Sequence, residues 1–192
     1  MKVLKILFFV LLSSTLFGQN PIDIANKYLD NIECHELLFV SIKKQKMYHL
    51  QNDSIIKEYI ISSSAYGIGS KAGSNKTPIG LHRIAGKFGS RTPENGRMVG
   101  RVFYGDIATI YTDNTKSKID DVTSRIFWLY GMEKGKNKGK GIDSYLRYIY
   151  IHGTSEEGRL GKPASHGCIR MKNKAIIDLY KLIEVGTLVL IL

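Results

Sequence analysis

YIHGT, at residues 150–154, and SHGCIRM, at residues 165–171, hold the densest group of reactive side chains in this 192-residue chain. Apolar and polar residues alternate from Tyr145 to Ile151, which predicts a strand that ends at His152. Cys168 follows Gly167 in a turn ahead of a predicted helix. A strand end next to a glycine-bearing turn is a place where a binding cleft can form.

The thiol of Cys168 and the imidazole of His152 are chemically complementary. A free cysteine has a pKa of about 8.5 and is a weak nucleophile until it is deprotonated. A neighbouring imidazole can take that proton and later return it to a leaving amine. Gly167 would allow close approach of a substrate, with the amides of Gly167 and Cys168 facing a developing oxyanion. A histidine and a cysteine sixteen residues apart are common, however, so the pair alone is modest support.

The rest of the chain predicts a mainly β fold with one packed helix. The helix would be capped by Asn173 and end at Gly186, because apolar residues recur there at helical spacing. Gln51-Asn52-Asp53-Ser54 is typical of a hairpin connection. Strands are expected at 37–42, 47–51, 55–61, 102–104, 124–131 and 187–192, and loops at 66–89, 91–100 and 133–141.

The first twenty residues have the pattern of a secretory signal peptide. Lys2 and Lys5 precede an unbroken apolar stretch at 6–12, and small residues follow, with cleavage expected around 18–20. The apolar stretch is shorter than the roughly 20 residues that a membrane span needs. A retained anchor is the alternative. We therefore expect an exported protein of the periplasm or cell envelope, without a membrane span once the signal is removed, and a single domain at 35–192.

The net charge limits the kinds of molecule that the protein is expected to bind. The formal net charge is +11, which favours anionic partners. Export argues against nucleic acid and leaves the carboxylates and acidic polymers of a cell wall.

Two cysteines in an oxidising compartment often form a disulfide. A reactive Cys168 must be a free thiol, so Cys34 is also expected to be unpaired.

Together, HGT and SHGCIRM resemble the signature of the L,D-transpeptidase catalytic domain (YkuD-type) family. The turn Thr77-Pro78-Ile79-Gly80 and the closing helix and strand are similar to that family as well, so the resemblance covers residues 37–192. It implies a compact β-sandwich-like fold with mixed sheets and an enzyme, a cysteine-dependent acyltransferase. In the family the corresponding cysteine is the nucleophile, here Cys168, and the histidine of the HG pair is the proton donor and acceptor, here His152.

The resemblance also implies supporting residues. His166 shapes the pocket, the carbonyl of Gly153 orients the imidazole, and Ser165 and Gly167 support the cysteine turn. Arg170 stands where many relatives carry asparagine and others arginine. Two roles are open for it: binding a substrate carboxylate, or bracing the turn.

The implied reaction is cell-wall acyl transfer on peptidoglycan stem peptides, forming 3→3 cross-links through a thioester, by a monomer without metal or cofactor. An L,D-carboxypeptidase or a wall-peptide hydrolase would use the same site. A zinc site at His152, His166 and Cys168, completed by His35 or Cys34, lacks the usual ligand spacing. A papain-like peptidase would carry its cysteine before its histidine, and a non-catalytic wall-binding module leaves the Cys–His pair unexplained.

Overall fold

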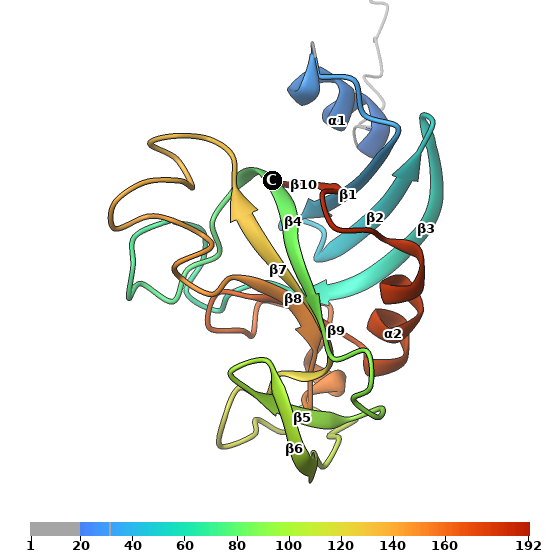
Figure 1. Ribbon diagram of the computed structural model, residues 1–192, viewed down its shortest axis with the longest axis vertical. Helices are drawn as coiled ribbons and strands as arrows, with labels where there is room; N and C mark the ends of the chain where they lie inside the picture. The colour runs from blue at the N-terminus through green and yellow to red at the C-terminus, as the bar shows by residue number, and fades with distance from the viewer. Residues whose placement is uncertain (1–19, 31) are drawn as a thin grey trace, which may run out of the picture.

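A computed structural model describes residues 20–30 and 32–192 and confirms the mainly β class (Figure 1). The predicted signal peptide lies outside the described residues, apart from Asn20. No helix in the described part of the chain is long and apolar enough to span a bilayer. The strands are β1 (Glu36–Ser41), β2 (Lys46–Gln51), β3 (Ser54–Ser62), β4 (Gly80–Phe88), β5 (Gly96–Val99), β6 (Val102–Ile107), β7 (Thr123–Gly131), β8 (Tyr150–Gly153), β9 (Ile169–Met171) and β10 (Leu188–Ile191).

The strands form one sheet that closes on itself. Their order is β4-β10-β1-β2-β3-β9-β8-β7-β5-β6, and an additional β4–β7 pairing joins the two sides. Most neighbours are antiparallel, whereas β1–β10 and β8–β9 are parallel. The β4–β7 pairing closes the sheet around its core, whereas the β5–β6 hairpin keeps an open edge on β6 and extends from the end of the molecule opposite α1 (Figure 1).

Helix α2 (Asn173–Leu182) packs its apolar face on the sheet and completes the main core. Ile176 and Leu179 are fully buried against residues of β7, β8 and β9, among them Phe127, Ile151 and Ile169. The predicted helix is therefore present, but its ends differ. Asn173 is the first helical residue rather than the cap, and the helix ends at Leu182, before Gly186.

A second helix, α1 (Pro21–Leu29), was not predicted. Asn20 accepts a hydrogen bond from the amide of Ile22 at 3.1 Å, and Pro21 occupies the first turn, where its missing N–H costs nothing. Ala25 and Leu29 are buried on the outer face of β1 and β2. The Tyr28 hydroxyl donates to Glu133 at 2.9 Å, which ties the helix to the loop after β7.

The predicted hairpin is confirmed, because Asn52 and Asp53 have the positive φ angles of a two-residue turn between β2 and β3. Two loop predictions were wrong: β4 lies within 66–89 and β5 within 91–100. The strand predicted from Tyr145 begins only at Tyr150, because the carboxylate of Asp143 accepts from the amides of Tyr145 and Leu146 and holds a turn there.

Candidate active site

The parallel pair β8–β9 brings the two conspicuous sequence segments together. Ile151 pairs with Ile169 and His152 pairs with Arg170. The two isoleucines face the main core. Because side chains alternate along a strand, His152 and Arg170 lie on the other face, and Cys168, one residue before Ile169, lies on that face as well. Cys168 directly precedes β9, and its sulfur accepts from the amide of Tyr150, two residues before His152.

The Cys168 thiol is partly buried and held by backbone groups of the strand beside it. The amide of Tyr150 donates to Sγ at 3.3 Å, and Sγ is 3.5 Å from the carbonyl of Tyr148. Burial raises the pKa of Cys168 to about 12, although the Tyr150 amide opposes the shift and Asp120 adds to it. The thiol is therefore protonated at neutral pH.

The His152 ring is almost completely buried and has a fixed tautomer. Its Nδ1 lies 2.6 Å from the carbonyl oxygen of Gly153, and since a carbonyl can only accept, Nδ1 carries the proton. Nε2 of the neutral ring is then free to accept one. Burial lowers the pKa of His152, against an opposing effect of Asp120. The Gly153 position has no room for a side chain, because a Cβ there would lie 2.5 Å from Oδ1 of Asn173.

The turn before the cysteine is fixed by hydroxyl groups. Ser165 Oγ donates to the carbonyl of Cys168 at 2.6 Å and accepts from the amide of Gly167 at 3.2 Å. Thr77 Oγ1 donates to the carbonyl of Gly167 at 2.9 Å, so the predicted 77–80 turn packs against the cysteine turn. Gly167 has a φ of +126°, which favours glycine. Since its amide is already bonded to Ser165, only the amide of Cys168 remains as an oxyanion donor of the two predicted.

A buried ion network lies under this turn. Arg170 is 2% exposed and pairs with Asp120 at 2.6 Å and with Glu156 at 2.7 Å. Asp120 also accepts from the amide and Nδ1 of His166, at 3.0 and 2.9 Å. Both sides of the Arg170 guanidinium are thus occupied by carboxylates. Of the two roles left open for Arg170, this geometry favours bracing the turn.

Sequence reasoning missed Asp120, which lies in the loop before β7. Burial alone would raise its pKa, but Arg170 and His152 outweigh burial and the pKa falls to about 2. No local motif marks this residue, because it reaches the site from 46 positions upstream of His166. The sole sequence signal is the charge of Arg170, which needs a carboxylate if it is buried.

Aromatic rings lie near the thiol, on strands β7 and β8 and in the segment that precedes β8. Trp128 stacks on Tyr145 with centroids 3.8 Å apart, and the rings of Tyr148 and Tyr150 lie 5.7 and 6.0 Å from it. Trp128 is 9% exposed and Tyr150 is buried, whereas Tyr148 is 57% exposed. The guanidinium of Arg101 covers Trp128 at 4.2 Å.

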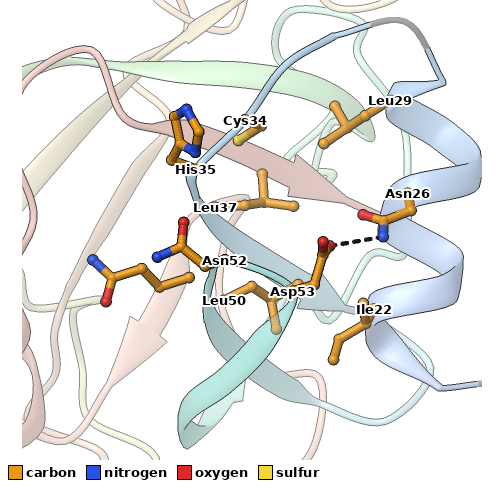
Figure 2. Close-up of a pocket in the computed structure, with 10 residues that line it drawn as sticks. Ile22, Asn26, Leu29, Cys34, His35, Leu37, Leu50, Asn52 and Asp53 are labelled. Carbon is orange, nitrogen blue, oxygen red and sulfur yellow. Dashed lines mark hydrogen bonds between the residues drawn. The ribbon is translucent and has the colours of Figure 1, made fainter.

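A separate cavity lies between α1 and the β1–β2 strands, where Cys34, His35 and Asp53 face it (Figure 2). It shares no lining residue with the Cys168 site. Both cysteines are free thiols, and Cys34 Sγ bonds to the carbonyl of Glu36 at 3.0 Å. Within the described residues, no group of three histidine, cysteine or acidic side chains is arranged to hold a metal ion.

The site thus combines a closed, mainly β sheet with a thiol and a neutral imidazole beside the parallel β8–β9 pair. The L,D-transpeptidase catalytic domain (YkuD) model matches residues 35–191. The chain belongs to this family.

Similar proteins agree with the assignment. YqjB and YkuD are L,D-transpeptidase homologues from Bacillus subtilis (strain 168). YqjB is 50% identical over 52 residues, covering 27% of this chain and 28% of its own. YkuD is 36% identical over 67 residues, covering 32% of this chain and 41% of its own. The crystal structure of the L,D-transpeptidase (residues 123–326) from Xylanimonas cellulosilytica DSM 15894 has a TM-score of 0.51 at 17% identity, covering 84% of this chain and 62% of that one, and supports the fold alone. The matches therefore span less than two thirds of each relative.

Proposed function

We propose that this chain is an exported peptidoglycan L,D-transpeptidase that forms 3→3 cross-links through a thioester on Cys168, with His152 as its base and acid. The observation that carries the proposal is the β8–β9 register, in which His152 pairs with Arg170 and Cys168 directly precedes the β9 strand. The Gly153 carbonyl fixes the tautomer that a base requires.

In the first half-reaction the sulfur of Cys168 attacks the carbonyl between the diamino acid and the terminal D-alanine of a tetrapeptide stem. The thiol proton passes to Nε2 of His152, and the amine of D-alanine takes it up as the C–N bond breaks. A thioester between the stem and Cys168 remains. We assign the developing oxyanion to the amide of Cys168, because the amide of Gly167 is bonded to Ser165.

In the second half-reaction the side-chain amine of a neighbouring stem attacks the thioester. His152 accepts the proton of that amine and returns it to the departing sulfur, which restores the thiol and leaves an amide cross-link. Water in place of the amine would give the L,D-carboxypeptidase reaction, or hydrolysis of a wall peptide. The acceptor therefore determines which of these reactions takes place, and Cys168 and His152 have the same roles in each.

Supporting roles follow from the contacts. Ser165 and Gly167 set the turn that carries the sulfur, and His166 extends from that turn to Asp120. Peptidoglycan stem peptides are the proposed partners, and their carboxylates suit the +11 net charge. We propose that the protein works as a monomer in the periplasm or cell envelope.

The test is incubation with purified disaccharide tetrapeptide, read by mass spectrometry. Release of D-alanine with formation of a cross-linked dimer supports transpeptidation, and tripeptide without dimer supports the carboxypeptidase. Cys168→Ala should abolish both products and the thioester adduct. Cys34→Ala is the matched control, because it removes the other free thiol and should leave the products unchanged. Equal turnover by Cys168→Ala and the wild type would overturn the proposal.

A further inference from the structure

Arg101 occupies a backbone position that a side chain disfavours. It forms the turn between β5 and β6 together with Gly100, and the two residues have φ angles of +71° and +55°. Such two-residue hairpin turns favour asparagine and glycine at these positions, because other side chains are strained there. An arginine held in that conformation suggests that its side chain has a use.

The guanidinium of Arg101 is held by aromatic groups rather than by a carboxylate. Its Nη1 donates to the hydroxyl of Tyr150 at 2.9 Å, and its Cζ lies 4.2 Å from the ring centre of Trp128 and 5.8 Å from that of Tyr148. Within the described residues Arg101 forms no ion pair. Its positive charge is therefore oriented but not neutralised.

The same two tyrosines hold the nucleophile. The amide of Tyr150 donates to the sulfur of Cys168, and the carbonyl of Tyr148 lies 3.5 Å from it. Arg101 is thus one tyrosine side chain away from the thiol. On its other side an open surface cavity of about 310 Å³ begins, lined by Arg101, Gly89 and Phe103. A peptide bound to Cys168 could extend past Tyr148, which is exposed, into this space.

Two other arginines near the thiol, Arg170 and Arg147, are already engaged. Arg170 pairs with Asp120 and Glu156. Arg147 donates to the carbonyls of Gly69 and Lys76, at 3.2 and 2.7 Å. In contrast to these two, Arg101 has a guanidinium that neither a carboxylate nor a backbone carbonyl of the described residues occupies, and the exposed Arg91 lines the same cavity.

We propose that Arg101 is a specificity-determining residue that binds a carboxylate of the acyl-donor stem peptide, a role that rests on the proposed function. Two carboxylates have this chemistry: the C-terminus of the tetrapeptide, and the distal carboxylate of the stem diamino acid where that residue carries one. A guanidinium binds either through paired, charge-assisted hydrogen bonds.

The test compares four donors with wild-type protein, Arg101→Gln and Arg101→Lys. The donors are tetrapeptides with a C-terminal acid or amide, each with lysine or diaminopimelate as third residue. Loss of a charge-assisted hydrogen bond should lower kcat/KM of Arg101→Gln about 10- to 100-fold on the donor whose carboxylate is bound. The wild-type preference for that donor over its uncharged counterpart should collapse towards one, and Arg101→Lys should restore part of it.

Arg83→Gln is the matched control, since the guanidinium of Arg83 also lies over a ring, that of Tyr130 at 4.6 Å, without contacting Tyr150. Near-UV circular dichroism of the Trp128 region identifies variants that have lost the fold. If correctly folded Arg101→Gln keeps the wild-type preference in both pairs of donors, the assignment is overturned. A wild-type protein that turns over none of the four donors would overturn the proposed function itself, and this assignment with it.

Discussion

Replacing Asp120 by asparagine tests whether the buried ion network supports the site. The folded protein lowers the pKa of Asp120 from 3.8 to about 2, with its side chain 20% exposed. A shift of this size corresponds to about 2.5 kcal/mol, so we expect Asp120→Asn to lower the free energy of unfolding at pH 7 by about 2 kcal/mol. Arg170 retains Glu156, which keeps the loss below that of a fully unpaired buried charge.

The pH dependence gives this prediction its sign. A depressed folded pKa stabilises the protein above the unfolded value near 3.8, and the contribution is lost as the pH falls through the folded value near 2. Urea denaturation should therefore show a gap between wild type and Asp120→Asn that is full at pH 5–7 and narrows between about pH 4 and pH 2. Asp178→Asn, an exposed carboxylate paired with Lys181, is the control and should cost less than about 0.5 kcal/mol. A gap of that small size for Asp120→Asn, or one that stays constant down to pH 2.5, would refute the reasoning.

Three further perturbations address the reactive groups and the space around them. His152→Gln should lower kcat about 10²- to 10⁴-fold because the proton carrier is lost, as measured by D-alanine release; a smaller loss would mean that another group moves the proton. Alkylation of Cys168 by iodoacetamide should accelerate about tenfold per pH unit from pH 8 to 10, since the pKa of the thiol is about 12, and a plateau below pH 9 would contradict this. Gly153→Ala should lower the free energy of unfolding by about 1–3 kcal/mol, because its Cβ would lie 2.5 Å from Asn173 Oδ1 and 2.8 Å from the carbonyl of Thr123; an unchanged urea midpoint would show that the strands can move apart.

Much of the fold could be predicted because many of its strands have a recognisable local sequence pattern. The first three predicted strands match β1 to β3, and the Asn52-Asp53 turn between β2 and β3 has the chemistry of its hairpin. Strand β4 could not be found in this way, because Gly80 and Gly86 weaken its pattern. It is a strand because β10 and β7 supply hydrogen bonds on its two sides, and such long-range partners leave no local signal.

The residues of the candidate site show the same contrast between local sequence patterns and long-range contacts. The HG and SHGC segments could be recognised in the sequence because the residues of each are contiguous. The neighbouring positions of β8 and β9 in the sheet then bring the two segments together. Asp120 was not, since the loop before β7 is brought to Arg170 only by the closed sheet. Asn173 illustrates a second kind of error, in which a residue was recognised but given the wrong role. Its amide suits a helix cap, but the folded chain uses it to bond Thr123, Thr154 and Glu157 beneath Gly153.

Burial acts in opposite directions on the two reactive groups, and this determines when the nucleophile forms. It raises the pKa of Cys168 and lowers that of His152, so a proton moved from sulfur to imidazole at rest would create two charges where neither is favoured. Under the proposed function, transfer becomes favourable only as a substrate carbonyl arrives to take the negative charge onto its oxygen, beside the amide of Cys168. Asp120, whose charge favours a protonated His152 and disfavours a thiolate, then stabilises the imidazolium that remains. In the proposed mechanism, a thiol activated in this way reacts slowly with small reagents and still acquires an acyl group from a bound peptide.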